Sequence, residues 1–248
     1  METNDNLLLE ENKNKIPKKK YYVQKEISKL LFFYFCIIFL QISEDNKKFL
    51  NIIIDVNKNI SENKIEKANN LKIAVCTMGK SENLYVKEYI DYYVKLGIDH
   101  LFIYDDNDQN TERISDEVEP KYETYVTVYE NIKDTIKDQS TVFTDCYHKN
   151  IDKYDWFLMV DMDEFLYIVN SSLKDYLVNE NFDKCDFIKF NWVNANDNGL
   201  LHYDNRSLFE RFKGPYIKDV FIKTIIRGNI SDLKYWVHSP YISPKRNY

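Results

Sequence analysis

The stretch DWFLMVDMDEF, residues 155–165, decides the fold that this sequence predicts. Its five consecutive apolar residues, Trp156–Val160, show no polar alternation, which is typical of a central strand buried on both faces of a parallel sheet. Side chains two apart on an extended chain point the same way, so we expect Asp161 and Asp163 to face one side together. The acids then lie at the carboxyl end of the strand, where open α/β sheets bind their ligands.

Two carboxylates at such a place repel each other unless a cation or a proton lies between them. Hard oxygen ligands suit Mg²⁺ or Mn²⁺, and Mg²⁺ is usually shared between one or two carboxylates and the phosphates of a substrate. The pattern therefore favours a metal–diphosphate site at Asp161 and Asp163. The alternative is a strand that ends in a solvated acidic turn, with one aspartate capping the next helix. The tripeptide alone does not decide between the two.

Hydrophobic periodicity extends this strand into a βαβαβαβ series, which predicts an α/β fold with a mostly parallel central sheet and flanking helices. Expected strands lie over 72–77, 100–104, 125–129, 186–190 and 220–227, and expected helices over 84–97, 111–117, 139–151 and 173–179. Gly97 stops the first helix. The chain has no GxGxxG motif after the first strand and no GxxxxGK[ST] motif, which argues against a dinucleotide fold and a P-loop.

Composition sets further bounds on the class of protein. The chain has 248 residues, enough for one sizeable domain plus an appendage, and 44% of them are hydrophobic. A net charge of −6 argues against a general nucleic-acid binder. The four cysteines are widely scattered, with no CxxC or CxxxC pair, so the sequence argues against a zinc ribbon and shows no sign of a disulfide framework.

The first 70 residues differ in composition from the rest. Residues 1–26 form a polar, basic tail, and residues 43–70 are charged and rich in asparagine, which suits a stem or linker. Residues 27–42 are apolar and predict a possible single-pass membrane anchor with a cytoplasmic N-terminus. At about 1.5 Å per residue this helix spans roughly 24 Å, against a hydrocarbon core of roughly 30 Å. The alternative is an apolar helix that packs on the domain of a cytoplasmic protein.

Two features after the acids carry candidate chemistry. Residues 191–199 are expected to form a polar loop, whose Trp192 either stacks on an acceptor or packs in the core. His238 is a candidate metal ligand that the fold returns to the acids, since imidazole binds Mn²⁺. A lone histidine is more often a packed or hydrogen-bonded residue, so both interpretations of His238 stay open.

Several blocks of the chain resemble glycosyltransferase family 92 and related family-2-type glycosyltransferases. They cover about residues 71–240 and follow the order expected of that family. The blocks are Lys80–Asn83, Val86–Ile90, Gly97–His100, Ile103–Asp106 and Trp156–Phe165, followed by Trp192, Arg211, Phe212, Lys223 and Trp236–His238.

The resemblance implies a GT-A fold over residues 71–248 and a nucleotide-sugar donor, typically a UDP-sugar, held through Mn²⁺ or Mg²⁺. By position, Asp163 resembles the direct metal ligand and Asp161 the ribose or metal contact. His238 falls where many GT-A enzymes return a ligand to the metal.

The resemblance also assigns the base and ribose of the donor to the ends of the first two strands. Thr77 and Glu82 at the first strand and Asp105 at the second fall where the family's fold cradles them. The acceptor is expected to be a glycan or glycolipid.

An inverting transfer needs a carboxylate that takes the proton of the acceptor hydroxyl. Asp197 is the candidate by position, and Asp204, Glu210 and Asp219 are alternatives. The chain departs from the family in its glycine-rich acceptor segment, which only Asn196–Gly199 represents.

Two other classes of protein stay open. A catalytically degenerate sugar-nucleotide-binding protein would bind metal and nucleotide without turnover. A haloacid-dehalogenase-like phosphatase also uses an apolar strand that ends in Asp-x-Asp, with the first aspartate as nucleophile. That pattern normally has Thr or Val where this chain has Phe165, and it normally opens its domain.

Overall fold

The computed structural model describes one long helix and most of the chain that follows it. The described residues are 44–108, 110–130, 132, 138–180, 182, 184–196, 199, 200, 202, 204–236 and 238–241. The chain divides into two compact units, residues 1–60 and 61–248.

The segment expected to be a stem or linker contains helix α2, Glu44–Asn70. The polar tail 1–26 and the apolar segment 27–42 lie outside the described residues. Within the part of the chain that the structure describes, no helix is both long enough and apolar enough to cross a membrane.

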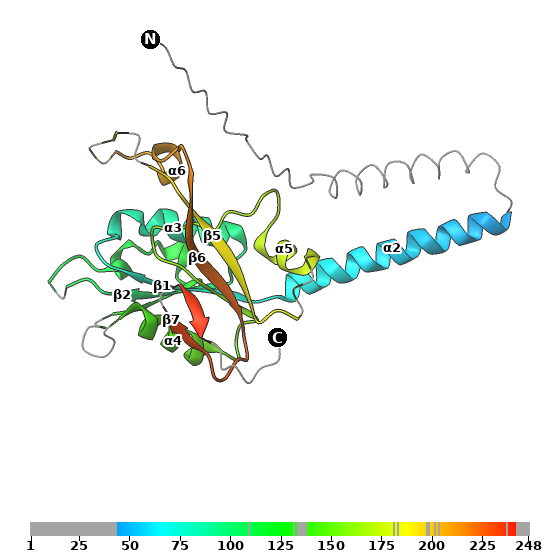
Figure 1. The fold of residues 1–248 in the computed structure, drawn as a ribbon, viewed down its shortest axis with the longest axis horizontal. Coiled ribbons are helices and arrows are strands. Elements are labelled where there is room, and N and C mark those ends of the chain that lie inside the picture. Colours follow the sequence, from blue (N-terminus) through cyan, green and yellow to red (C-terminus); the bar gives the residue numbers. More distant parts are fainter. Residues whose placement is uncertain are drawn as a thin grey trace, which may run out of the picture. The chain divides into compact units, whose positions relative to one another are not determined.

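A six-stranded sheet in the order β3-β2-β1-β4-β6-β5 organises the second unit (Figure 1). Its first four strands by position are parallel: β3 (Val126–Tyr129), β2 (His100–Asp105), β1 (Ile73–Gly79) and β4 (Trp156–Met159). β6 (Ile217–Arg227) is antiparallel to both of its neighbours, β4 and β5 (Phe187–Asn194). The predicted α/β class with a mostly parallel sheet is confirmed, and it is consistent with a GT-A-like fold.

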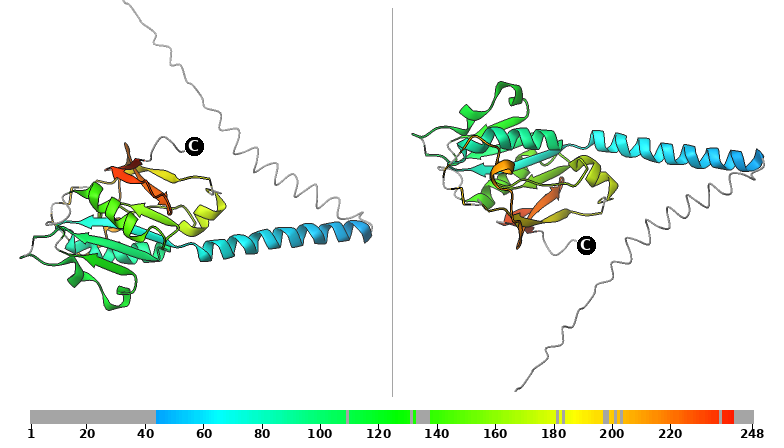
Figure 2. Two further views of the ribbon diagram at one scale, coloured as in Figure 1. Left: turned by 90° about the horizontal axis from the view of Figure 1, so that it is seen from below. Right: turned by 90° about the horizontal axis from the view of Figure 1, so that it is seen from above.

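Two helices cover opposite faces of this sheet, α3 (Val86–Leu96) on one and α4 (Gln139–Asn150) on the other (Figure 2). Alternate residues of each strand feed the two cores, because side chains alternate across a strand. Ile73 and Val75 of β1 pack in the core that contains α3, whereas Ala74 and Cys76 pack in the core that contains α4. All four residues of β4 are buried, as the uninterrupted apolar run predicts. Gly97 ends α3 in the left-handed conformation, with φ of 94°.

The remaining elements are short. They are the 3₁₀ helices η2 (Asn83–Tyr85), η3 (Ile114–Glu117) and η4 (Pro120–Tyr122), helices α5 (Leu173–Asn179) and α6 (Leu208–Arg211), and the two-stranded sheet of β7 (Lys234–Trp236) and β8 (Ser239–Tyr241).

A disulfide joins Cys76 of β1 to Cys146 of α4 within the core that contains α4. Both side chains are fully buried, and 70 residues of sequence separate them. The cysteine spacing shows no sign of this bond, because only the packing of α4 against β1 brings the two sulfur atoms together. Cys185 is a free thiol of intermediate exposure.

The expected polar loop over residues 191–199 is wrong in its first half. β5 continues to Asn194, so Trp192 lies on a strand. Among the described strands, β5 pairs with β6 alone, and the outer part of β5 is exposed. Polar residues are tolerated on such a strand, so its sequence resembles that of a loop. The pairing shifts register between Asn191 and Val193, which marks a β-bulge beside Trp192.

Candidate functional site

The carboxyl ends of β1, β2 and β4 lie side by side at one edge of the sheet, because the three strands are parallel neighbours. Gly79 at the end of β1 lets the following loops pack closely there. A Cβ atom at this position would lie 2.2 Å from Met162 Sδ and 2.7 Å from Ile114 Cδ1. The amide of Asp106 also donates to the carbonyl oxygen of Gly79, at 2.9 Å. The three loops therefore pack against one another, so a substitution that displaces one loop also displaces the others.

Asp161 follows β4 and is held on both oxygens by protein groups. Lys223 of β6 places its ammonium nitrogen 2.8 Å from Asp161 Oδ2, and the Gln139 side-chain amide donates to Oδ1. The same ammonium lies 3.3 Å from Glu164 Oε2, and that oxygen also accepts from the Asp161 amide at 2.9 Å. Lys223 is 4% exposed and the Asp161 side chain is 28% exposed, so the ion pair is partly buried and is screened less than a surface pair.

Asp163 has a different environment. Its side chain is exposed, and no described side chain donates a hydrogen bond to its carboxylate. Desolvation and the neighbouring charge of Asp161 raise the pKa of Asp163. Asp161 is thus hydrogen-bonded by protein groups on both oxygens, whereas the exposed carboxylate of Asp163 is open to a ligand.

Further acids add to this negative potential. Desolvation, and next the charge of Asp161, raise the pKa of Glu164 to about 7. Burial and the charge of Asp163 raise the pKa of Glu82, which the sequence places after β1. A nearby cation stabilises the ionised form of such carboxyl groups, because it offsets the repulsion between their charges. Within the described ranges, no group of three His, Cys, Asp or Glu residues is placed to hold a metal ion by itself. A divalent cation here would need Asp163 together with oxygens from a substrate.

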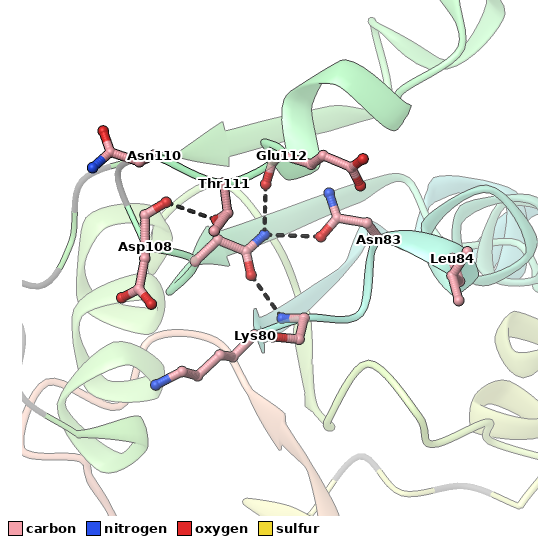
Figure 3. A pocket seen from close by; sticks show the side chains of 9 residues that line it. Lys80, Asn83, Leu84, Asp108, Asn110, Thr111 and Glu112 are labelled. Atoms are coloured by element: carbon pink, nitrogen blue, oxygen red, sulfur yellow. Dashed lines mark hydrogen bonds between the residues drawn. The ribbon is translucent and has the colours of Figure 1, made fainter.

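A cavity of about 500 Å³ opens between the loops that follow β1 and β2 (Figure 3). Asn107 links its walls: the side-chain amide donates to Asn83 Oδ1 at 2.9 Å and to the carbonyl oxygen of Glu112 at 3.0 Å. Its side-chain oxygen accepts from the Ser81 amide at 2.6 Å. The other lining residues are Lys80, Leu84, Asp108, Asn110 and Thr111. The cavity opens at the same edge of the sheet as Asp161 and Asp163, neither of which lines it, and the sequence analysis assigned no role to Asn83 or Asn107.

The three residues predicted for the base and ribose occupy unequal positions. Glu82 is partly exposed and lies within electrostatic range of Asp163. Asp105 is 2% exposed, and its two oxygens accept the amides of Asn107 and Ile114, each at 2.9 Å. Thr77 is fully buried, with its hydroxyl beside that of Tyr89. In this structure Asp105 fixes the shape of the loop after β2, and Thr77 lies beneath the site.

His238 lies on the β6 side of the site. Its ring centre is 5.5 Å from that of Trp192 and 5.1 Å from that of Phe221. Desolvation and the charge of Lys223 lower the pKa of His238, against the opposing effect of Asp161. The fold thus returns His238 to the vicinity of Asp161, and the lowered pKa favours the neutral imidazole that binds metals or donates through one nitrogen.

The predicted catalytic base, Asp197, lies outside the described residues. The three alternatives are each engaged locally. Asp204 pairs with Arg206, whose hydrogen bonds hold the pKa of Asp204 at about 2, and Glu210 completes the capping box of α6. Asp219 accepts the amides of Val220 and Phe221 at the bulge, and the bond from Phe221 lowers the pKa of Asp219. A depressed pKa makes a carboxylate a weaker base.

Lys223 and Gln139 are the contacts that sequence reasoning did not assign to the site. Lys223 interrupts the apolar run of β6, and a charged residue on a core strand requires a partner. That interruption is a signal that could have identified it. Gln139 carries no comparable signal, because its contact depends on where α4 begins.

Comparison with known proteins identifies the family. The family model described as "Glycosyltransferase family 92" matches residues 69–226. Three relatives from that family share segments with this chain. A protein of Arabidopsis thaliana is 31% identical over 106 residues, one of Oryza sativa subsp. japonica 30% over 109, and one of Ricinus communis 24% over 110.

These segments cover 42–44% of this chain and only 18–20% of each relative's own length. The family match itself includes the ends of β1, β2 and β4 and most of β6, with Lys223 among them. The chain belongs to glycosyltransferase family 92.

Proposed function

We propose that this protein is a metal-dependent glycosyltransferase that moves a sugar from a nucleotide-sugar, typically a UDP-sugar, to a hydroxyl group of a glycan or glycolipid. The observation that carries the proposal is the different setting of the two acids after β4. Asp161 is held by Lys223 and Gln139, whereas Asp163 is exposed, and a cavity opens at the same sheet edge. Such a surface offers one rigid and one available carboxylate to a diphosphate with its cation.

The acidic surface fits a hard divalent cation, Mn²⁺ or Mg²⁺, because its ligands are carboxylate oxygens, and desolvation together with the charge of Asp161 raises the pKa values of Asp163 and Glu164. Asp163 would hold the ion together with oxygens of the donor, with His238 as a further candidate ligand. When bound, the cation acts as a Lewis acid that neutralises the departing diphosphate.

The nucleoside belongs, in this proposal, in the cavity between the loops after β1 and β2. Its volume of about 500 Å³ accommodates a nucleoside, and Asn83 and Asn107 present amide groups at its wall. Glu82 is the sequence neighbour of Ser81 and Asn83, which line the cavity, and the charge of Asp163 contributes, after burial, to its raised pKa. This position suits a contact with the ribose. Asp105 and Thr77 contribute by fixing the loop and the strand end on which the nucleoside rests.

For the transfer step we retain Asp197 as the candidate general base of an inverting reaction. Its carboxylate would take the proton of the acceptor hydroxyl as that oxygen attacks the anomeric carbon and the nucleoside diphosphate leaves. The residue follows β5, whose Trp192 borders the site, so the position of the chain suits an acceptor-side group.

The proposal is tested by product formation with the full chain. A panel of UDP-sugars is incubated with Mn²⁺ and with simple glycoside and glycolipid acceptors, and released UDP is measured alongside the glycosylated product. The proposal predicts UDP release that requires the metal and an acceptor and that falls in Asp163→Asn. Binding of UDP and Mn²⁺ without turnover of any donor would instead favour the catalytically degenerate alternative.

The configuration of the new linkage, measured by nuclear magnetic resonance of the product, separates inversion from retention. Inversion together with loss of turnover in Asp197→Asn supports Asp197 as the base. Full turnover in that variant would assign the role to another carboxylate. The apolar segment 27–42 is retained as a proposed membrane anchor, and partition of the full chain with membranes tests it.

A further inference from the structure

Lys223 is the most deeply buried cation beside the acids. Its ammonium group has three N–H donors, and two of them face Asp161 and Glu164. Among the described residues, no other carboxylate or carbonyl oxygen accepts the third. The Trp192 ring also lies near the ammonium, with 5.6 Å between Lys223 Nζ and the ring centre. The ammonium is therefore fixed in direction, with one donor left for a ligand.

Two ring nitrogens near Lys223 also lack partners. Trp192 Nε1 and His238 Nδ1 are buried and make no hydrogen bond with any described residue. The two rings meet edge to face, with 5.5 Å between their centres. Buried polar groups without partners are rare, and each costs free energy unless a ligand, an ion or water satisfies it. Indole nitrogen is a donor only, so whatever satisfies Trp192 must be an acceptor.

We propose that Lys223 and Trp192 form an anion subsite that receives the terminal phosphate of the nucleoside diphosphate. This inference rests on the proposed function and adds to it a phosphate contact made by the protein itself, on the β6 side of the site. Asp163 and its cation would bind the same diphosphate, with His238 beside the subsite as the further candidate ligand of the cation. Asp161 is then a positioning residue, which acts by holding the Lys223 ammonium.

The charges favour this division of roles. An ammonium held between carboxylates keeps its position, and hydrogen bonds from charged donors to phosphate are among the strong ones in proteins. The bulge between β5 and β6 sets Trp192 and Phe221 beside each other, 5.3 Å between ring centres, and so fixes the indole next to the lysine. A hydrogen bond that involves a charged group changes an affinity by about 10- to 100-fold.

The test is calorimetry of the full chain in excess EDTA, with UDP and with uridine as ligands. Wild type is expected to bind UDP more tightly than uridine without metal, by about tenfold or more. Lys223→Met should remove that difference and leave the affinity for uridine unchanged. Trp192→Phe keeps an aromatic ring but lacks the N–H, and should weaken UDP about tenfold with no effect on uridine.

Three further variants separate a phosphate contact from a fold defect. Lys223→Arg keeps the charge and should retain part of the preference for UDP. Lys223→Met combined with Asp161→Asn and Glu164→Gln removes all three charges of the cluster, so it should fold as wild type yet still lack the preference. Lys189→Met changes an exposed lysine on neighbouring β5 and should alter nothing.

The outcomes distinguish this inference from the proposed function. Mn²⁺-dependent UDP binding that requires Asp163, with an unchanged metal-free preference for UDP in Lys223→Met and Trp192→Phe, overturns the subsite and leaves the proposed function standing. No UDP binding by the folded wild type under any condition overturns both.

Discussion

The disulfide between Cys76 and Cys146 makes a quantitative prediction for stability. Cross-linking two residues restricts the unfolded chain, and the loop closed here corresponds to a sequence separation of 70. For a loop of that size the chain-entropy relation gives about 4 kcal/mol at 25 °C. In a unit of this size, 1 kcal/mol shifts the melting temperature by roughly 2–4 °C, so reduction should lower it by about 10 °C.

The bond also connects stability to the site. Cys146 lies in α4, whose first residue, Gln139, donates to Asp161, and Cys76 lies in β1. Loss of the bond should therefore weaken UDP binding as well as lower the melting temperature. The assay is differential scanning calorimetry of the full chain with and without dithiothreitol, together with UDP titrations.

The matched variants are Cys146→Ala, which should reproduce the effect of reduction, and Cys185→Ala, which removes the free thiol and should not. Free-thiol titration under denaturing, non-reducing conditions should find two fewer thiols than the four cysteines of the chain. Four free thiols and a melting temperature insensitive to dithiothreitol would refute the cross-link and the magnitude derived from it.

Three further predictions follow from the packing and charges of the site. Gly79→Ala should destabilise the protein by about 1–3 kcal/mol in thermal or urea unfolding and weaken UDP binding, because the added Cβ meets Met162 and Ile114; a wild-type melting curve would contradict it. Asn107→Ala should weaken uridine binding about tenfold in calorimetry with or without metal, since it removes the amide that joins the walls of the cavity; equal affinities would place the nucleoside elsewhere. The pKa of Glu164, raised from 4.5 to about 7, means that the folded state holds this proton more tightly than the unfolded chain. Its contribution to stability is therefore full below pH 4.5 and is lost as the pH rises to about 7, by up to about 3 kcal/mol. Urea unfolding of metal-free protein should show this slope in wild type and not in Glu164→Gln, and equal slopes would exclude it.

The sequence predicted the parallel strands of the sheet, most of whose residues form continuous buried apolar runs. β4 and its two following acids are legible because a strand covered on both faces excludes polar residues. Helix α5 has the residues expected for it, and Gly97 ends α3 as predicted, because the signals for both are local in sequence.

The β5–β6 side was less predictable because the conformation of its residues depends on contacts with residues far away in the sequence. Trp192 lies among polar residues that resemble a loop, yet pairing with β6 keeps it in a strand. The contact of Gln139 with Asp161, and the pairing of Cys76 with Cys146, depend on the placement of α4 against the sheet. Sequence spacing carries no trace of such contacts.

The most direct test of the central claim is calorimetry of the full chain with UDP, with and without Mn²⁺, on wild type and Asp163→Asn. The matched control is Asp152→Asn, which changes an exposed acid in the turn before β4. The account predicts that Mn²⁺ strengthens UDP binding in wild type and in the control, and that this gain disappears in Asp163→Asn. Equal UDP affinity in all three proteins with and without Mn²⁺ would contradict the assignment of Asp163 to a metal–diphosphate site.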